Sequence, residues 1–331
     1  MKRIAAVVLI VLALSFLMTG CGKKITLNFS FGQRTGTYSG DMENGIPNGY
    51  GKFTTKNNDG TGWTYEGNWK NGHFEGEGKT TWKSGQIEIG TYLNDSIVPM
   101  KDDEIKTLHT SPENFKNHVV EIAGRIFNAP EYSDSSVSFQ MWADFENSEK
   151  NTVVHVMDAD FKVQADDYVK IIGTVGDVFK GKNAFGAEVT APTIIAKEST
   201  VLSYQEAVVP TIKEISVNQT VTQLGYSVTV AKVEFAEKET RVYVKIENNG
   251  NAKFSLYSFN AKIVQGNKQF EEQNNWNADY PEVQTGLLPT TSTEGIIVFP
   301  ALEVKPFKIL FDCSSDNWRE DLKDYEYDIQ F

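Results

Sequence analysis

The stretch that decides the fold is Tyr65-Glu66-Gly67-Asn68-Trp69-Lys70-Asn71-Gly72-His73-Phe74-Glu75-Gly76-Glu77-Gly78. The pair Asn71-Gly72 supplies the positive backbone φ angles of a tight turn, so the flanking residues are expected to form an antiparallel hairpin. Its aromatic side chains provide flat surface for stacking along the strands. A single hairpin is barely stable in water, so neighbouring hairpins must bury each other's aromatic face.

The same pattern recurs on both sides of this stretch. One unit begins at Tyr38, and a third begins at Glu88 and stops early. Half of the 26 glycines lie between Gly36 and Gly90, which separates this region in composition from the rest of the chain. Self-similarity at a fixed period predicts a repeat architecture. The side chains expected to stack on one face of the sheet are Tyr38, Tyr65, Trp69, Trp82 and Tyr92.

The spacing Tyr-x-Gly-x-Trp-x-x-Gly-x-x-x-Gly-x-Gly at Tyr65 to Gly78 resembles the membrane occupation and recognition nexus (MORN) repeat. In the preceding unit Met42 replaces the tryptophan of that family, and the loop around Asn57 is long. The resemblance implies a curved antiparallel sheet over residues 25–95 that binds proteins or lipid headgroups. It implies no catalytic residues.

Residues 1–20 have the pattern of a bacterial lipoprotein signal peptide. Lys2-Arg3 precede an apolar run that ends at Met18, too short for a membrane span of about 20 residues. Small residues then lead to Cys21, before which cleavage is expected. The Cys21 sulfur would carry a diacylglycerol, with acyl chains such as palmitate, and would anchor the protein to the extracytoplasmic face of the cell membrane. The alternative is an uncleaved anchor helix with an incidental cysteine.

The distance from the anchor to the repeats is expected to be short. Ile25 is four positions after Cys21, a distance of at most about 14 Å, and the residues from Ile25 to Phe31 already alternate as a strand. Lys23 and Lys24 would each add about 1 kcal/mol of attraction to an anionic leaflet. The repeat sheet is therefore expected to lie close to the headgroups, with the other domains pointing outward.

Charge and cysteine content exclude several classes of partner. The chain carries a formal net charge of −12, and loss of the two basic residues of the signal peptide makes it more negative, so nucleic acid is a poor partner. Cys21 and Cys313 are the only cysteines, and lipidation of the first leaves no intramolecular disulfide. Cys313 ends an alternating run and is interpreted as a structural thiol.

Residues 104–200 are predicted to form a small five-stranded barrel. Thr110 and Glu113 have the spacing of a capping box, so a short helix is expected at the start. Val119–Phe127, with Gly124 at a bend, and Asp167–Val175 resemble the OB-fold of the anticodon-binding-like type. The five expected strands are Val119–Phe127, Val137–Ala143, Val153–Met157, Tyr168–Val175 and Glu188–Ala196.

The barrel offers one candidate ligand site. Trp142 falls on the polar side of its strand, and a following loop lies where OB-folds commonly take ligands. A sugar or a peptide would stack there; the alternative is an edge tryptophan packing on the helix beside an ordinary loop. Because acidic residues outnumber basic ones in this region, a nucleic-acid ligand is disfavoured. The candidate residues are Trp142, Phe179, Lys180, Lys182 and Phe185.

Residues 216–331, after an expected linker at 203–216, are predicted to form a third strand-rich domain. Its C-terminus alternates apolar and polar residues from Tyr325 to Phe331, which indicates a strand with one buried face. Val242–Gly250, Gly295–Phe299 and Ile309–Asp312 resemble the immunoglobulin-like sandwich found at the C-termini of bacterial extracellular lipoproteins. The resemblance assigns architecture and no site.

Motifs for catalysis or cofactor binding do not emerge from the sequence. The four histidines have no metal-ligand spacing, and Asp158 with Asp160 lacks the pattern of a calcium loop. Gly76–Thr80 resembles the end of a phosphate-binding loop, but position 73 is His73 rather than glycine and no helix is expected to follow. We therefore predict no cofactor and no metal.

Together these features predict an all-β protein: a MORN-like meander, an OB-like five-stranded barrel with a short helix, and an immunoglobulin-like sandwich. We expect a membrane-anchored, non-enzymatic binding or scaffold module of the cell envelope, with a protein, lipid headgroup or glycan as partner. One alternative is a cell-envelope glycan hydrolase that uses acidic residues. The other is a substrate-capture lipoprotein of a transporter, although the sequence lacks the two-lobed α/β pattern usual for capture by domain closure.

Overall fold

The computed structural model describes residues 22–57, 59–182, 186 and 188–331. The fold is all-β, with 59% strand and 5% helix, as the sequence predicts. The chain divides into two compact units, the first ending at Thr200 and the second comprising Val201–Phe331 with residues 167–169. The predicted signal peptide and lipidation site, residues 1–20 and Cys21, lie outside the described residues.

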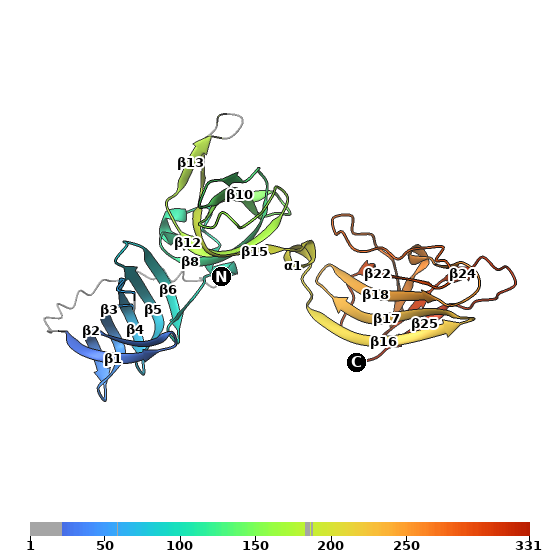
Figure 1. Ribbon diagram of the computed structural model, residues 1–331, viewed down its shortest axis with the longest axis horizontal. Coiled ribbons are helices and arrows are strands. Elements are labelled where there is room, and N and C mark those ends of the chain that lie inside the picture. The colour runs from blue at the N-terminus through green and yellow to red at the C-terminus, as the bar shows by residue number, and fades with distance from the viewer. Residues whose placement is uncertain (1–21, 58, 183–185, 187) are drawn as a thin grey trace, which may run out of the picture. The chain divides into compact units, whose positions relative to one another are not determined.

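The first unit opens with a seven-stranded antiparallel meander whose strands pair in chain order (Figure 1). This confirms the meander expected from the repeats. Its strands are β1 (Lys23–Phe29), β2 (Gly32–Glu43), β3 (Ile46–Lys56), β4 (Gly62–Lys70), β5 (His73–Trp82), β6 (Ile87–Leu93) and β7 (Ser96–Val98). Asn71 and Gly72 have φ angles of 51° and 86°, as the predicted tight turn requires.

A row of glycines crosses the middle of this sheet. Gly40, Gly51, Gly67, Gly78 and Gly90 are paired in register across strands β2 to β6. We call this row the glycine ladder. It leaves a strip of backbone without side chains, and larger rings can therefore lie directly on the sheet.

The repeat tyrosines occupy this strip. Tyr65 lies so close to the ladder that a Cβ atom added to Gly78 would be 2.5 Å from its Cε2 atom and 2.6 Å from its Cζ atom. The Tyr65 hydroxyl donates a hydrogen bond to the carbonyl oxygen of Asn68 at 2.9 Å. In the preceding unit Tyr38 lies against the ladder in the same way, and its hydroxyl donates to the Asp41 carbonyl at 2.7 Å.

Trp69 fills the space between the two tyrosines. Its ring is 5.3 Å from each of Tyr38 and Tyr65 in edge-on geometry, and its Nε1 donates to the carbonyl oxygen of Gly51 at 3.0 Å. Four of the five predicted stacking side chains are buried, and Trp82 packs at the margin of the cluster. The buried cluster consists of Phe29, Tyr38, Phe53, Trp63, Tyr65, Trp69, Phe74 and Tyr92.

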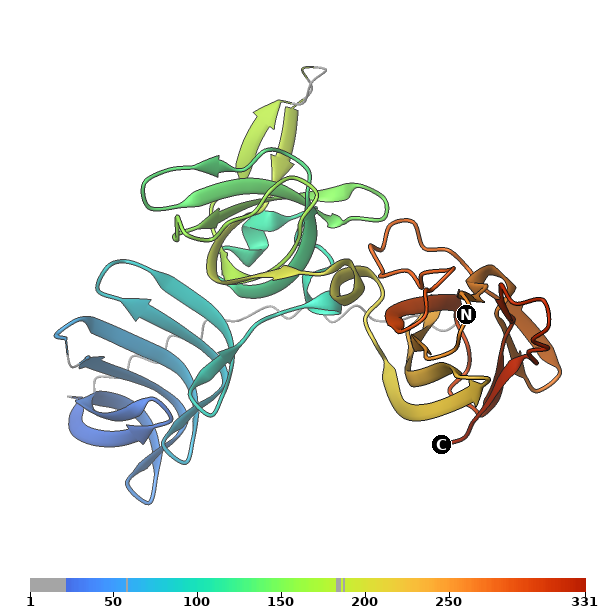
Figure 2. The same ribbon diagram turned by 45° about the vertical axis from the view of Figure 1, so that its right-hand side comes forward.

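The rest of the first unit is a closed five-stranded barrel. The ring closes because β10 pairs with both β8 and β11, and β11 runs parallel to β15. Figure 2 shows the short β13–β14 hairpin projecting from it. The barrel strands are β8 (Val119–Ile126), β10 (Val137–Asp144), β11 (Glu149–Val156), β12 (Tyr168–Val175) and β15 (Thr193–Leu202); the additional strands are β9 (Glu131–Tyr132), β13 (Phe179–Lys182) and β14 (Glu188–Ala191).

Several local predictions for the connecting segments were wrong. In place of a helix capped by Thr110 there are 3-10 turns at η1 (Asp102–Ile105) and η2 (Pro112–Phe115), because the chain must enter β8 four residues after Phe115. The expected strand Glu188–Ala196 is broken at Pro192, which cannot donate to a sheet ladder. The expected linker at 203–216 contains helix α1 (Tyr204–Val208) and the first residues of β16.

The second unit consists of two four-stranded antiparallel sheets around one apolar core, with strand orders β16-β17-β18-β22 and β21-β20-β23-β25. The first sheet contains β16 (Lys213–Gln223), β17 (Tyr226–Phe235), β18 (Glu239–Asn248) and β22 (Thr291–Pro300). The second contains β20 (Lys262–Gln265), β21 (Lys268–Glu271), β23 (Phe307–Phe311) and β25 (Tyr325–Ile329). A short pair, β19 (Phe254–Leu256) and β24 (Cys313–Ser315), and the turn η3 (Ser258–Asn260) complete it.

The C-terminal strand joins the two sheets, as its alternation predicts. The hydroxyls of Tyr325 and Tyr327 donate to the carbonyl oxygens of Tyr226 and Val228, at 2.9 and 2.6 Å. Cys313 is buried and unpaired, and burial raises the pKa of its thiol well above the ordinary value. A buried, protonated thiol is a packing group rather than a nucleophile.

The glycine ladder predicts that a Gly→Ala substitution lowers stability only where the added Cβ atom would overlap a neighbouring ring. Gly78→Ala should lower the free energy of unfolding of the repeat sheet by about 1–3 kcal/mol, because the added methyl group overlaps the Tyr65 ring. Gly62→Ala is the matched control, since its Cβ would meet no atom closer than 3.7 Å. Urea unfolding followed by near-ultraviolet circular dichroism measures both, and equal effects of the two substitutions would contradict the prediction.

Candidate functional site

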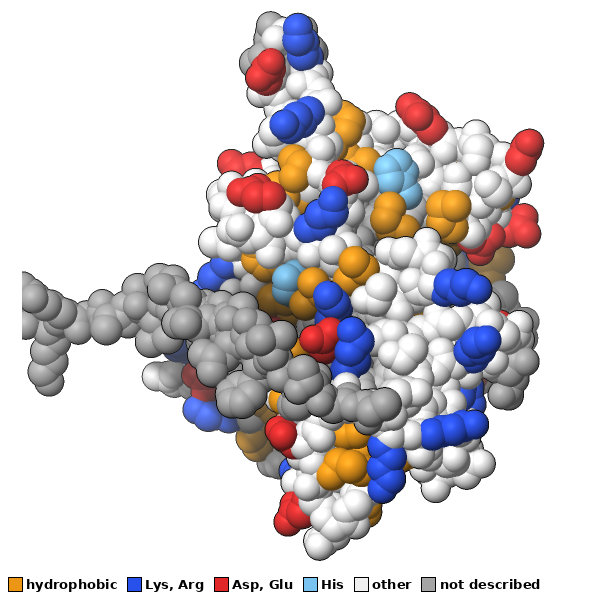
Figure 3. Space-filling view, turned by 90° about the vertical axis from the view of Figure 1, so that its left-hand side faces the viewer, with side chains coloured by type: hydrophobic (Ala, Val, Ile, Leu, Met, Phe, Trp, Pro, Cys, Tyr) orange, Lys and Arg blue, Asp and Glu red, His pale blue; other side chains and the backbone are white. Residues whose placement is uncertain are grey.

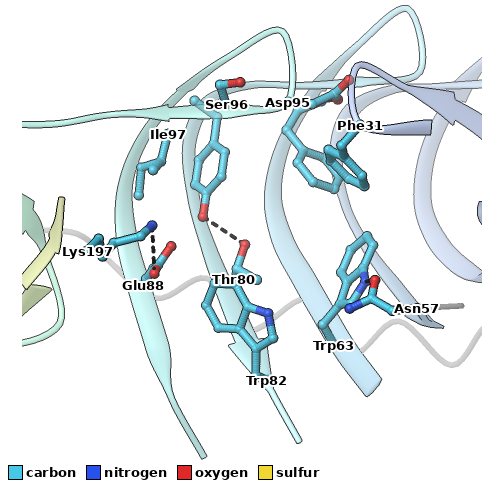
Figure 4. A pocket seen from close by; sticks show the side chains of 12 residues that line it. Phe31, Asn57, Trp63, Thr80, Trp82, Glu88, Asp95, Ser96, Ile97 and Lys197 are labelled. Atoms are coloured by element: carbon cyan, nitrogen blue, oxygen red, sulfur yellow. Dashed lines mark hydrogen bonds and ion pairs between the residues drawn. The ribbon is translucent and has the colours of Figure 1, made fainter. Parts of the chain in front are cut away.

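A pocket of about 400 Å³ opens beside the aromatic cluster of the repeat sheet (Figure 4). We call it the aromatic pocket. Trp63, Trp82 and Thr80 enter it from β4 and β5, while Lys197 reaches it from barrel strand β15. Its volume lies within the range of about 300–1,000 Å³ found for small-molecule sites. The lining residues are Phe31, Asn57, Trp63, Phe74, Thr80, Trp82, Glu88, Tyr92, Asp95, Ser96, Ile97 and Lys197.

Polar atoms around the aromatic pocket are paired with one another. Thr80 Oγ1 and the Tyr92 hydroxyl are 2.7 Å apart, and Trp63 Nε1 donates to Asn57 Oδ1 at 2.8 Å. Burial raises the pKa of Tyr92 to about 12, so its hydroxyl stays protonated near neutral pH. These bonds fix the orientation of the rings, and the pocket is therefore formed in advance of any ligand.

One ion pair closes the side of the pocket next to the barrel. Lys197 Nζ lies 2.9 Å from Glu88 Oε1, and the Glu88 side chain is only 5% exposed. The same oxygen accepts a hydrogen bond from Gln86 Nε2 at 3.2 Å. Nearby, the amide of Ile89 donates to the carbonyl oxygen of Asn117 at 2.8 Å, which joins the sheet backbone to the residues before β8. The pocket thus depends on both the sheet and the barrel.

Asp95 ties the first hairpin to the far end of the sheet. Its carboxylate accepts hydrogen bonds from the amides of Ser30 and Phe74, each at 2.8 Å, and lies 2.8 Å from His73 Nδ1. The Ser30 contact holds Phe31 at the rim of the pocket, where its ring is 46% exposed. Phe31 stacks on Phe29 of the aromatic cluster, with ring centroids 5.0 Å apart, and extends the cluster to the surface.

The described residues of the predicted barrel site lie on two strands, Trp142 on β10 and the other three on β13. Trp142 stacks on Phe127, the residue that follows β8, with ring centroids 3.9 Å apart, whereas the alternative interpretation expected it to pack on the helix. Phe179, Lys180 and Lys182 lie on the β13 strand of the projecting hairpin, with both lysines exposed. Phe185 lies outside the described residues.

The histidines have separate environments. His73 pairs with Asp95, His109 lies 2.8 Å from Thr152 Oγ1, and His155 lies 2.7 Å from Ser138 Oγ. Burial, with a smaller contribution from Lys150, lowers the pKa of His109 to about 4 and keeps it neutral. Within the described ranges, no three His, Cys, Asp or Glu side chains are grouped to hold a metal ion.

The structure also bears on two further questions, the resemblance to a phosphate-binding loop and the presence of membrane-spanning helices. Gly76–Thr80, which resembles the end of a phosphate-binding loop, lies within strand β5, and a hairpin strand rather than a helix follows it. Among the residues from 22 onward that the structure describes, no helix has the length and apolar composition needed to cross a bilayer.

Comparison with protein families identifies the class of the repeat sheet. The family model of the MORN repeat matches residues 38–60 and 65–87. These two segments contain Tyr38, Tyr65 and four of the five ladder glycines, so the two complete repeats predicted from the sequence are confirmed. A search of curated proteins with the whole chain finds no match.

Trp63, Phe74 and Lys197 line the aromatic pocket but are not among the site residues predicted from the sequence. Trp63 and Phe74 alternate in phase with the repeat tyrosines, so the period-two pattern of the strands would have found them. Lys197 had no such signal, because it is more than a hundred residues from Glu88 in the chain and meets it only when the barrel is folded.

The Glu88–Lys197 pair predicts that removing the lysine lowers the stability of the first unit and that neutralising the glutamate then restores it. Lys197→Ala should lower the stability of the first unit by about 1–2 kcal/mol, because it leaves a buried carboxylate without its cation. Adding Glu88→Gln to the same chain should recover most of the loss. Thermal unfolding measures both effects.

Lys308→Ala is the control for this prediction. Lys308 pairs with Glu326, but both side chains are 40% or more exposed, so its removal should leave the unfolding temperature nearly unchanged. Additive losses from Lys197→Ala and Glu88→Gln would contradict the proposed role of the pair.

Proposed function

We propose that this chain is a lipid-anchored, extracytoplasmic binding protein of the cell envelope without catalytic activity, and that its aromatic pocket is the binding site of the membrane-proximal sheet. The observation that carries the proposal is the preformed pocket. Three of its rings, Trp63, Phe74 and Tyr92, are buried in the aromatic cluster of the repeat sheet, and its hydrogen-bonding groups are paired with one another before a ligand arrives. Rigid aromatic surface binds at low cost in conformational entropy.

The start of the first strand supports a position close to the membrane. Strand β1 begins at Lys23, so a lipid on Cys21 would be separated from the sheet by Gly22 alone, a distance of about 7 Å. β1 is also the edge strand of the sheet, with Lys23 and Lys24 exposed. These two lysines would meet anionic headgroups.

The distribution of charge supports the same orientation. Residues 22–98 contain eight basic and eight acidic side chains, whereas residues 99–331 contain 22 basic and 36 acidic ones. Figure 3 shows basic side chains spread over the surface of the repeat sheet. An anionic membrane would repel residues 99–331, where acidic side chains outnumber basic ones, and would not repel the repeat sheet, where the two are equal in number.

The other domains fit a binding role. We propose that the barrel is of the OB type, supported by its closed five-stranded ring and its parallel β11–β15 pair. We also propose that the second unit is immunoglobulin-like, supported by two antiparallel sheets around one core. Both architectures are better known for binding than for catalysis.

Expression of the full chain in a bacterium tests the anchor. The mature protein should partition into the membrane fraction, and mass spectrometry of its N-terminal peptide should show a diacylglycerol on Cys21. Cys21→Ser should abolish the lipid mass and release any cleaved protein from the membrane. A wild-type protein recovered in the aqueous fraction with residues 1–20 intact would refute the proposal.

Photo-crosslinking in the same cells tests the pocket. A photoreactive residue at Phe31, on the pocket rim, should capture a discrete envelope component, and Trp82→Ala should reduce capture by about tenfold through loss of aromatic contact. Lys83→Ala, an exposed neighbour of Trp82, is the control and should leave capture unchanged. Capture that is equally strong in Trp82→Ala would show that the aromatic pocket is not the site.

A further inference from the structure

A long loop of the second unit, residues 272–283, is fastened to the free edge of strand β22. The amide of Gln273 donates to the Val298 carbonyl at 2.8 Å, and the amide of Ile296 donates to the Pro281 carbonyl at 2.8 Å. Gly295 permits this close approach, because a Cβ there would lie 2.6 Å from the backbone nitrogen of Val283. The loop is therefore held at both ends.

A buried ion pair holds the middle of the same loop. Arg241, which is fully buried, donates to Glu239 Oε1 at 2.9 Å. Glu239 in turn accepts hydrogen bonds from two loop side chains, Asn275 Nδ2 at 2.8 Å and the Tyr280 hydroxyl at 2.5 Å. A carboxylate compensated by a buried guanidinium fixes these side chains from below. The loop is therefore held by hydrogen bonds at both ends and in its middle.

The fixed loop presents an aromatic ring to solvent. Trp276 is 84% exposed, and Phe259 from the turn η3, which is 69% exposed, lines the same pocket of about 430 Å³. Two exposed rings that line one pocket are a more specific sign of a ligand site than a single exposed ring. The buried network fixes Asn275 and Tyr280, and with them the segment of the loop that carries Trp276.

Hydrogen-bonding groups surround the two rings. The pocket is lined by the carboxylates of Glu272, Asp279 and Glu282 and by the amide of Asn274. Burial raises the pKa of Glu272; a hydrogen bond from Ser258 opposes this shift, and the charge of Glu282 adds to it. This concentration of negative charge repels phosphates and other anions. The favoured ligand is one that donates hydrogen bonds and carries no negative charge.

We propose that this pocket binds a neutral saccharide. A sugar ring offers a flat face of C–H groups, which packs against an aromatic ring such as Trp276 or Phe259. Its hydroxyl groups donate to carboxylates and exchange hydrogen bonds with an amide, which matches the polar lining. The site lies in the second unit, independent of the aromatic pocket and of the lipid anchor.

Calorimetric titration of the purified full-length protein in detergent tests the proposal. The probes are the neutral oligosaccharides cellohexaose, maltohexaose and chitohexaose, with hexalysine as a cationic peptide. At least one oligosaccharide should bind, and Trp276→Ala should weaken its affinity by about tenfold through loss of ring contact. Asp279→Asn should weaken it less, because an amide still accepts a hydrogen bond.

Trp318→Ala is the matched control. Trp318 is also 84% exposed and belongs to the second unit, but it does not line this pocket, so its replacement should leave saccharide affinity unchanged. Circular dichroism of each variant verifies that the fold is retained. The proposal is overturned if none of the oligosaccharides binds at millimolar concentration, if Trp276→Ala and Trp318→Ala weaken binding equally, or if hexalysine alone binds. A protein that is lipidated and retained at the membrane would still support the proposed function in each of those cases.

Discussion

The first unit depends on a steric constraint, the contact between the tyrosine rings and the glycine ladder. Tyr38 and Tyr65 can lie flat on the sheet only where the opposing residues, Gly51 and Gly78, have no Cβ. This contact fixes the strand register, because a slip by one residue would place a side chain beneath each ring. It also orients Trp69, whose indole donates to the Gly51 carbonyl. The aromatic pocket is the margin of this packed cluster.

The two candidate sites use the same principle with different chemistry. In the aromatic pocket, rings are fixed by packing within the buried aromatic cluster and by hydrogen bonds such as that between Trp63 and Asn57. In the second unit, Trp276 is held through its loop by a buried network centred on Arg241 and Glu239. In each case contacts within the folded protein fix the segment that carries the aromatic side chains before binding. Binding then costs little additional conformational entropy.

Local patterns predicted most of the strands, and contacts between distant segments account for the rest. The glycine and tyrosine spacing predicted the meander, because each contact joins neighbouring strands. The end of the barrel was mispredicted, since the effect of Pro192 on a continuous apolar run depends on its position in the sheet. Lys197 and Glu88 were missed because their pairing requires two folded domains. The loop carrying Trp276 lacked any periodic signal, and its importance follows from its attachment to Glu239.

A double-mutant cycle between Gly78 and Tyr65 tests the central claim most directly. If the ladder exists to accommodate the ring, Gly78→Ala should be costly in the wild-type chain and nearly neutral in a Tyr65→Ala background, with a coupling energy of about 1–3 kcal/mol. Equal costs of Gly78→Ala in the two backgrounds would show that the ring and the glycine act independently. That result would contradict the structural basis proposed for the sheet and its pocket.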